Sequence, residues 1–284
     1  MKIMVTGASG QLGRAVMRAV RARGMEAWGV STADFDLTDA AAVNAAVLAE
    51  RPDAVIHCAA YTAVDLAESE PARCMAVNAA GTMNLARAAA QVKAKLLYVS
   101  TDYVFSGEGD QPHETEERPG PLNVYGLSKW QGEEAVRALC TRFFIVRTSW
   151  VFGLEGRNFV RTMLRLGRSQ QTVRVVDDQI GAPTYAEDLA VLLAEMIRTE
   201  RYGVYHAANE GCCSFADFAA AIMRASGSSC RVEPIRSEEY PSAARRPLNS
   251  RLSMRSLDEN GFRRLPMWED ALTRFLRAAG EAEG

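Results

Sequence analysis

The segment VTGASGQLGRAV, residues 5–16, decides the fold of this chain. It places Gly7, Gly10 and Gly13 between a predicted strand and a predicted helix. Glycine tolerates positive φ and lets the backbone come close to a pyrophosphate at a helix N-terminus. The spacing is GxxGxxG and differs from the plain GxGxxG dinucleotide fingerprint, so an ordinary tight turn remains an alternative for the pattern alone. Its place in the first strand-to-helix turn favours dinucleotide binding.

Strand and helix patterns alternate through the first half of the chain. Short apolar runs predict strands at 2–7, 26–30, 53–59, 95–100 and 143–148, and helical patterns fall between them at 11–23, 39–50, 72–91 and 124–139. The apolar runs are too continuous for strands with one wet face, so the strands are expected to be buried on both sides. The predicted fold class is α/β, with a doubly wound (Rossmann) parallel sheet covered by helices.

The second half is less regular. Helices are expected near 156–169, 186–199, 215–226 and 268–278, and strands near 172–176, 203–207 and 231–235. We interpret residues 1–150 as a dinucleotide-binding domain and residues 151–284 mainly as a smaller α/β C-terminal substrate-binding lobe that interleaves with it. Residues 106–121 and 237–250 are expected to form long loops over the site, because loops of this length are uncommon unless they are functional.

Composition excludes several classes of protein. The chain has 284 residues, 48% of them hydrophobic, and a formal net charge of -2, so no basic field indicates nucleic-acid or membrane-surface binding. Six cysteines lie without a CxxC pair, which favours a reducing compartment. The N-terminus lacks the pattern of a signal peptide, and no segment approaches the roughly 20 apolar residues of a membrane helix. We expect a cytoplasmic protein.

A tyrosine and a lysine stand four residues apart in PLNVYGLSKW, residues 121–130. Free tyrosine has a pKa of roughly 10, and a cation within reach stabilises the phenolate and lowers that pKa. Residues i and i+4 are neighbours on a helix, so Tyr125 and Lys129 can act together. The alternative is an ordinary amphipathic helix with a packed tyrosine and an exposed lysine.

Other polar residues fall at predicted strand ends. VSTDYVF, residues 99–105, places Ser100 or Thr101 at the carboxyl edge of the sheet, where ligands bind. Asp36 follows the second strand and is the candidate for the adenosine ribose, although Asp36 or Thr38 could equally cap the next helix. No basic residue beside this strand end indicates a 2′-phosphate site, so the choice between NADPH and NADH stays open.

Together, the glycine turn, the hydroxyl and the YxxxK spacing resemble the extended short-chain dehydrogenase/reductase superfamily. Within it, segments spread from residue 5 to 253 are similar to the dTDP-4-dehydrorhamnose reductase family: VTGASGQLG, HCAAYTAVDLAESEP, STDYVFSG, PLNVYGLSKWQGE, RTSWVFG, NFVRTML, VVDDQIGAPT and RRPLNSRLS. The YxxxK signature indicates only the superfamily, whereas AAYTAVD and DDQIGAPT are more specific to this branch.

This resemblance implies an NAD(P)H-dependent reductase that acts on the C4 keto group of dTDP-4-dehydro-6-deoxy-L-mannose. Tyr125 would be the proton donor, Lys129 would hold the nicotinamide ribose and tune Tyr125, and Thr101 would hydrogen-bond the sugar carbonyl. The expected cofactor-binding residues are Gly7, Gly10, Gln11, Leu12, Gly13, Asp36, Leu37, Ala59, Ala60, Tyr125 and Lys129. The expected substrate-binding residues are Thr62, Val64, Asp65, Tyr103 and Trp150.

Each substrate assignment has an alternative. Trp150 ends a strand and could belong to the core, and Val64 could simply pack. Arg245 and Arg246 could contact the diphosphate or be solvated loop charges. Residues of the DDQIGAPT segment are expected on the nucleotide side.

Some members of the family form a magnesium-linked dimer through an acid just after the glycine turn. This chain has Arg14 and Ala15 there, and Glu187 and Asp188 remain as possible acids. Two carboxylates without a third ligand are weak evidence for magnesium. We therefore expect no required metal, and a monomer or weak homodimer.

Three rival functions were weighed against the residues. A reductase of another nucleotide-linked 4-keto-deoxysugar stays open, because the two long loops would set that choice. A non-catalytic NADP-binding regulatory subunit would have no need of Thr101, Tyr125 and Lys129 together. A dehydratase normally needs an Asp-Glu pair, whereas Asp102 and Tyr103 follow Thr101 here.

Overall fold

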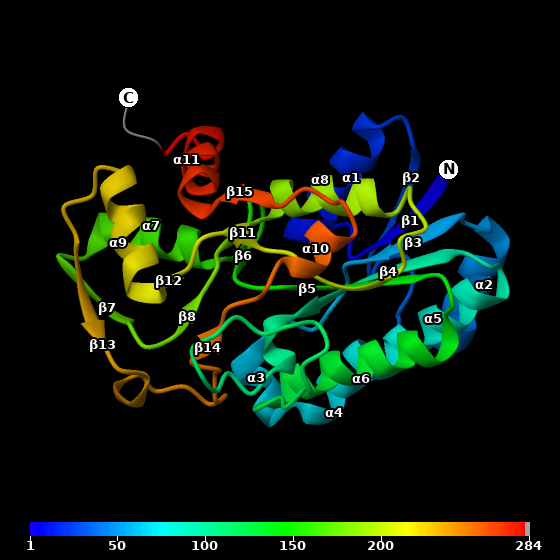
Figure 1. Ribbon diagram of the computed structural model, residues 1–284, viewed down its shortest axis with the longest axis horizontal. Helices are drawn as coiled ribbons and strands as arrows, with labels where there is room; N and C mark the ends of the chain where they lie inside the picture. The colour runs from blue at the N-terminus through cyan, green and yellow to red at the C-terminus, as the bar shows by residue number, and fades with distance from the viewer. Residues whose placement is uncertain (282–284) are drawn as a thin grey trace.

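A parallel sheet of six strands forms the centre of the larger part of the molecule (Figure 1). The computed structural model describes residues 1–281. The strand order is β10-β5-β4-β3-β1-β2 and every neighbouring pair is parallel. The strands are β1 (Lys2–Thr6), β2 (Glu26–Val30), β3 (Ala54–His57), β4 (Lys95–Thr101), β5 (Phe143–Thr148) and β10 (Gly203–His206). The order reverses at β1, which creates a crevice at the carboxyl ends of β1 and β3. The predicted doubly wound fold is confirmed.

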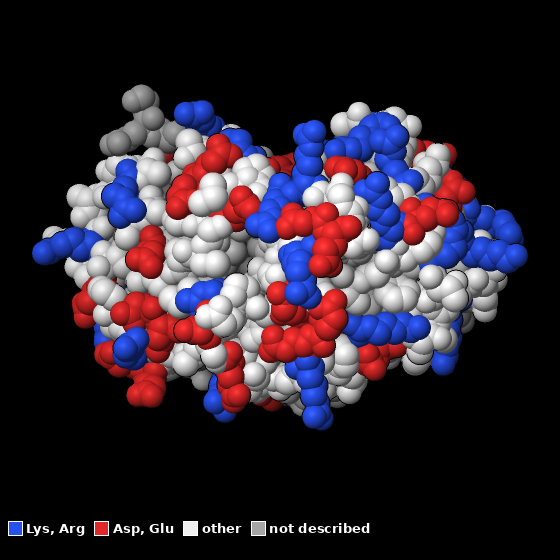
Figure 2. Space-filling model, in the orientation of Figure 1, with Lys and Arg blue, Asp and Glu red and all other residues white. Residues whose placement is uncertain are grey.

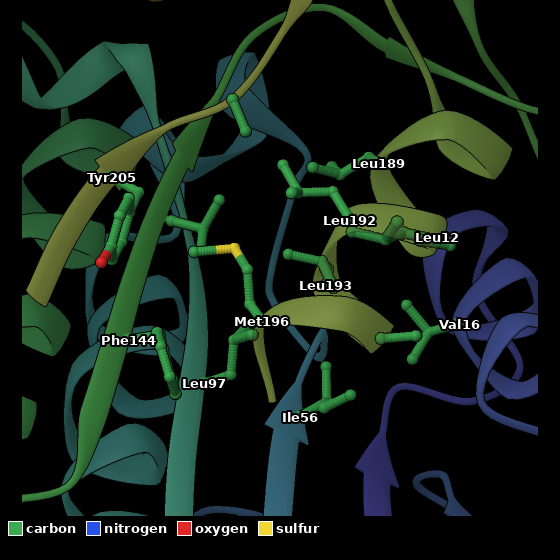
Figure 3. Close-up of a cluster of buried hydrophobic side chains, with 14 of the residues drawn as sticks. Leu12, Val16, Ile56, Leu97, Phe144, Leu189, Leu192, Leu193, Met196 and Tyr205 are labelled. Carbon is green, nitrogen blue, oxygen red and sulfur yellow. The ribbon is translucent and has the colours of Figure 1, made fainter. Parts of the chain in front are cut away.

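Two helices cover one face of this sheet: α1 (Gln11–Ala22) and α8 (Ala186–Met196). Each presents one apolar side, and Figure 3 shows these side chains meeting residues of the strands beneath them. Val16 of α1, Leu193 of α8 and Ile56 of β3 are all fully buried in this cluster. Burial of this apolar surface fixes α1, and with it the glycine turn, against the end of β1.

The opposite face is covered by α2 (Ala40–Glu50), α5 (Gly81–Gln91) and α6 (Val124–Leu139). The predicted helix over 72–91 is a longer helical run that starts with α4 (Pro71–Met75) and passes through a π-helical turn (Ala76–Ala80) before α5. A further short helix, α3 (Val64–Ser69), precedes it. The N-cap of α2 is Asp39, whose carboxylate accepts from two backbone N–H groups, so neither Asp36 nor Thr38 caps this helix.

A second, smaller layer of helices and strands lies at the other end of the long axis (Figure 1). It contains α7 (Phe159–Ser169), α9 (Phe215–Ala225), α11 (Trp268–Ala279) and the parallel pair β7 (Thr172–Val176) and β13 (Arg231–Ile235). Its own core is aromatic: Phe152, Phe218, Trp268 and Phe275 pack together. This lobe therefore has a hydrophobic core of its own.

Short elements connect the two parts. They are β6 (Val151–Phe152) with β9 (Thr184–Tyr185), β8 (Ile180–Gly181) between β12 (Cys213–Ser214) and β14 (Asn249–Ser250), β11 (Asn209–Glu210) with β15 (Leu265–Met267), and α10 (Arg255–Glu259). The chain leaves the sheet after β5, returns to it for α8 and β10, and leaves again. The functional division at residue 150 stays a prediction.

Both signs of charge are interspersed over the face shown in Figure 2. Many of these charges are paired, as in the contacts of Arg264 with Asp258 and Glu210. Among the described residues, no helix is long and apolar enough to cross a membrane.

Replacing Gly13 by alanine tests the packing of the turn that starts the fold. The added Cβ would lie 2.1 Å from the carbonyl oxygen of Gly7 and 2.7 Å from its carbonyl carbon, so α1 would have to move away from β1. Overpacking of this kind costs about 1–3 kcal/mol, more than the roughly 0.5–1 kcal/mol that alanine contributes in a helix interior. We expect a lower free energy of unfolding, measured by chemical denaturation without cofactor.

Gly120→Ala is the matched control, because a Cβ at this position would meet its nearest atom at 3.4 Å. It should leave the denaturation midpoint nearly unchanged. Equal midpoints for Gly13→Ala and wild type would show that the turn is not tightly packed.

Candidate active site

A cavity of about 550 Å³ opens at the carboxyl edge of the sheet. We call it the first cavity. It is lined by many of the predicted residues: Gly7, Gly10, Gln11, Leu12, Gly13, Leu37, Ala59, Ala60, Thr62, Thr101, Tyr125, Lys129 and Trp150. Four predicted residues, Asp36, Val64, Asp65 and Tyr103, lie outside this lining. The tertiary structure therefore brings most of the candidate set to one place.

The glycine turn forms a close-fitting cradle on one side of the first cavity. Gly7 has a φ of 66°, and a Cβ there would lie 2.7 Å from the backbone nitrogen of Ala59. Only glycine takes this conformation without strain. The first residues of α1 line the cavity directly behind the turn, and a helix N-terminus favours a phosphate group. The cradle fits the pyrophosphate of a dinucleotide.

The Asp36 carboxylate, beyond the end of β2, is hydrogen-bonded within its own loop. The Asp36 carboxylate turns back to accept the backbone N–H of Thr38 at 2.8 Å, and this hydrogen bond lowers its pKa. The cavity is lined here by Ser31, Thr32 and Phe35. An adenosine-binding role of Asp36 stays a prediction, and the hydroxyls of Ser31 and Thr32 are the polar groups nearest the space.

Asn123 sets the start of α6 and thereby the positions of Tyr125 and Lys129. Its side-chain oxygen accepts the N–H of Gly126 at 2.8 Å, as an N-cap. Its amide nitrogen donates to the carbonyl of Arg245 at 2.8 Å and so ties the helix to the 237–250 segment. A Cβ on Gly126 would lie 2.2 Å from the carbonyl oxygen of Tyr103, so this glycine allows the helix to begin against the turn after β4.

The Tyr125 phenol is held in its protonated form. Burial raises its pKa well above the ordinary value, and the neighbouring charge of Asp102 raises it further. A hydrogen bond with the Thr101 side chain opposes these effects. The ring of Tyr103 packs edge-on against Tyr125 with ring centroids 5.8 Å apart. A protonated phenol beside a threonine hydroxyl can donate a proton to a bound oxygen.

Lys129 lies in the core behind Tyr125 and is 3% exposed. Its Nζ donates to the carbonyl of Val99 at 2.8 Å and lies 4.0 Å from the ring centroid of Tyr98. Burial lowers its pKa to about 7, and the charge of Glu133 opposes that shift. The alternative of an exposed surface lysine is wrong. Tuning of the Tyr125 phenol by Lys129 stays a prediction.

Two polar residues at the first cavity were missed by the sequence analysis as site residues. Asp102 Oδ2 and Thr148 Oγ1 are buried without a hydrogen-bond partner among residues 1–281. Burial raises the pKa of Asp102 to about 6, and its Oδ1 accepts the Thr101 hydroxyl at 2.9 Å. Both residues sit at the carboxyl ends of β4 and β5, where ligands bind, and this placement could have identified them.

A second cavity, of about 860 Å³, lies toward the smaller lobe. Its lining includes the aromatic rings of Phe159, Phe215 and Tyr240, the cations Arg174, Arg245 and Arg246, and residues 106–109 and 237–248 of the two long segments. Trp150, which lines the first cavity, stacks on Phe215, which lines the second, with centroids 3.7 Å apart. The two cavities therefore adjoin across this stacked pair.

Trp150 has a backbone conformation that is rare for a bulky residue, with a φ of 47°. The strained backbone holds the indole between Phe215 and Gly181, where a Cβ on the glycine would lie 2.8 Å from the indole ring. The indole also borders the first cavity. Trp150 thus packs against the core of the smaller lobe and also borders the first cavity, and its role as a platform for the sugar stays a prediction.

Asp65 and Tyr103, two of the remaining predicted substrate residues, contact the 237–250 segment. Asp65 accepts Arg246 Nη2 at 2.7 Å, Ser242 Oγ at 2.8 Å and the N–H of Ala244 at 3.2 Å, so it anchors the 237–250 segment. Arg246 also hydrogen-bonds Tyr103. Val64 only begins α3. Direct sugar contacts by Val64, Asp65 and Tyr103 stay predictions.

The acids considered for magnesium are engaged in ion pairs. Glu187 pairs with Arg18, and both oxygens of Asp188 lie 2.7 Å from the guanidinium of Arg274. Within the described part of the chain, no three His, Cys, Asp or Glu side chains converge as ligands for a metal ion.

Comparison with known proteins places this geometry in a family. Residues 1–280 match the RmlD substrate binding domain family. The chain is 43% identical to a dTDP-4-dehydrorhamnose reductase of Streptomyces griseus, over 95% of this chain and 91% of the relative. It is 38% identical to the spore coat polysaccharide biosynthesis protein SpsK of Bacillus subtilis, over 99% of each.

A solved structure agrees with these sequence relatives. The crystal structure of dTDP-4-dehydrorhamnose reductase from Bacillus anthracis in complex with NADP superposes with a TM-score of 0.95 at 42% identity, covering 98% of this chain and 99% of that one. The match therefore extends over both lobes of this chain. This chain belongs to the RmlD substrate binding domain family.

Proposed function

We propose that this chain reduces the C4 keto group of dTDP-4-dehydro-6-deoxy-L-mannose with NADPH or NADH and so forms dTDP-L-rhamnose. The observation that carries the proposal is the meeting of Thr101, Tyr125 and Lys129 in the first cavity. The glycine cradle lies on one side of these residues, and the second cavity adjoins on the other across Trp150 and Phe215. A cofactor and a nucleotide sugar could thus meet at the phenol of Tyr125.

The second cavity has the chemistry of a nucleotide-diphosphate site. Arg174, Arg245 and Arg246 line it and could meet a diphosphate, although Arg174 and Arg246 also pair with Glu239 and Asp65. The exposed ring of Tyr240 suits a base. The diphosphate would lie between this cavity and the sugar, with the sugar beside Trp150. This arrangement favours a nucleotide-linked keto sugar over a free sugar.

The residues of the first cavity have different roles in the reduction. When bound, the reduced nicotinamide supplies the hydride. Tyr125 is protonated by its surroundings and donates its proton to the oxygen of the former carbonyl. Thr101 holds a hydroxyl beside the phenol, where it stabilises negative charge that develops on that oxygen. Lys129 places a cation behind the phenol, where it can hold the cofactor ribose.

Turnover of the sugar by the purified full chain tests the proposed function. The protein is supplied with enzymatically generated dTDP-4-dehydro-6-deoxy-L-mannose, and loss of nicotinamide absorbance is followed with NADPH and with NADH. Recovery of dTDP-L-rhamnose, with a rate that a chelator does not change, is the expected result. A protein that binds NADPH but oxidises it only with another keto-sugar nucleotide would overturn the assignment of this substrate.

Tyr125→Phe removes the proton donor and keeps the ring. We expect turnover to fall by about two orders of magnitude or more, while the NADPH dissociation constant changes little because the cradle is untouched. Steady-state kinetics and fluorescence titration of NADPH measure the two effects. Near-normal turnover would rule out Tyr125 as the donor.

Lys129→Ala removes a buried cation, and we expect it to weaken both NADPH binding and turnover. Loss of a charged hydrogen bond costs about 1.5–3 kcal/mol, which corresponds to a rise of about ten- to a hundredfold in the NADPH dissociation constant, together with lower turnover. Leu127→Ala on the same helix is the control, since Leu127 is 39% exposed. Unchanged NADPH affinity in a folded Lys129→Ala protein would contradict the ribose-binding role.

A further inference from the structure

A fully buried carboxylate lies one helical turn beyond Lys129. Glu133 is 0% exposed and accepts four hydrogen bonds. Ser100 Oγ donates to it at 2.6 Å, Arg147 donates through Nε at 2.9 Å and Nη2 at 2.8 Å, and Arg137 donates through Nη2 at 3.0 Å. A buried charge with this many partners is costly to disturb. The reaction as derived above makes no use of it.

Glu133 and Lys129 bind consecutive residues of β4. Lys129 Nζ donates to the carbonyl of Val99, and the next residue, Ser100, donates its hydroxyl to Glu133. The third residue in line is Thr101, which lines the first cavity. In one contact the helix donates to β4, and in the next β4 donates to the helix. These two adjacent contacts fix the register of α6 along β4. A slide of the helix by one residue would break both contacts and separate Tyr125 from Thr101.

Arg147 extends this arrangement to the rest of the site. It comes from β5, is 1% exposed and packs over the Phe105 ring, with its guanidinium carbon 4.9 Å from the ring centroid. Its Nη1 donates to the carbonyl of Thr115 at 3.1 Å and lies 3.4 Å from His206 Nε2. The Glu133–Arg147 pair therefore joins α6, two strands and the 106–121 segment.

The charge of Glu133 also acts on Lys129. Several ionisable groups face the Lys129 amine from the elements around it: Glu133 on α6 itself, Cys58 after β3, Cys74 on α4, His57 on β3, and Tyr98 on β4. Burial raises the pKa of both thiols and of the Tyr98 phenol and lowers that of His57 to about 3, so these four groups are neutral near pH 7. Glu133 is the only carboxylate among these five groups.

We propose that Glu133 is a positioning residue for the reduction, which holds α6 in register with the end of β4 and places a carboxylate one helical turn from Lys129. This inference rests on the proposed function for its kinetic consequences. Glu133 does not touch the first cavity; it acts through Lys129 and Ser100.

Glu133→Gln is the test variant, and Glu134→Gln is its matched control. Glutamine keeps the shape of the side chain and removes the charge. Glu134 is the next residue on α6 and pairs only on the surface, with Arg137 at 2.9 Å and its own side chain 55% exposed. Both proteins are compared with wild type in circular dichroism, steady-state kinetics with NADPH and the keto sugar, and the pH dependence of kcat/KM.

Removal of the Glu133 charge should lower the pKa of Lys129, since the carboxylate favours the ammonium form. The alkaline limb of kcat/KM should therefore move to lower pH by about one unit or more. We expect kcat to fall by about tenfold and KM for the sugar to stay within about twofold, because the substrate contacts are intact. Glu134→Gln should keep the wild-type profile.

A folded Glu133→Gln protein whose alkaline limb stays in place would overturn the proposal and leave Glu133 a purely structural residue. If Glu133→Gln does not fold, Glu133→Asp decides, because it keeps the charge and draws the carboxylate back from Ser100 on β4. A drop in kcat with an unmoved alkaline limb supports positioning through β4; unchanged kcat overturns it.

The pH dependence of NADPH binding separates this inference from the proposed function. Fluorescence titration across the same pH range needs no turnover of the sugar. Suppose that the pH dependence of NADPH binding shifts in Glu133→Gln but the wild-type protein does not reduce the sugar. This result would support the Glu133–Lys129 coupling and contradict the proposed substrate. If the wild-type protein reduces the sugar and NADPH binding has the same pH dependence in wild type and Glu133→Gln, the Glu133–Lys129 coupling is contradicted and the proposed function stands.

Discussion

The close approach of α6 to β4 is the contact on which the site depends. Two glycines permit it: a Cβ on Gly126 would lie 2.2 Å from the Tyr103 carbonyl, and one on Gly132 would lie 2.3 Å from the Tyr98 hydroxyl. Because the helix lies so close to the sheet, the side chains one and two turns apart on its buried face reach the end of β4 directly. Tyr125 then meets Thr101, and Lys129 meets the Val99 carbonyl. A larger residue at either glycine would displace the helix and separate these groups.

This close packing also sets the electrostatics of the site. Exclusion of water pushes both Tyr125 and Lys129 toward their neutral forms. A neutral phenol is what a proton donor requires, whereas a neutral lysine would lose the charge that holds an anion or a ribose. Glu133, paired with Arg147 and fully buried, opposes the effect at Lys129 and leaves Tyr125 largely to burial and Asp102. One helix thus carries two groups whose pKa values are adjusted by different neighbours.

Several of the contacts between the second lobe and the first lie around the two cavities. The stacked Trp150 and Phe215 rings form the border, and Asp65 and Asn123 hold the 237–250 segment beside it. Because these anchors come from the sheet side, the segment that lines the second cavity is positioned by the same elements that carry Tyr125. Under the proposed function, the segment expected to recognise the substrate and the helix that carries the expected proton donor are therefore held by shared contacts, even though their residues lie far apart in the sequence.

The sequence by itself determined the alternation of strands and helices, the glycine turn and the Tyr125–Lys129 spacing, because these depend on local periodicity and on neighbours within one helical turn. It also indicated Ser100 or Thr101, since a strand end is visible as the end of an apolar run. Only the tertiary structure decided that Asp65 anchors a loop and that, among residues 1–281, Asp102 Oδ2 and Thr148 Oγ1 are buried beside the first cavity without a hydrogen-bond partner. The role inferred for Glu133 likewise rests on partners 33 and 14 residues away. These contacts join segments that are distant along the chain, so they exist only after the sheet has brought the strand ends together.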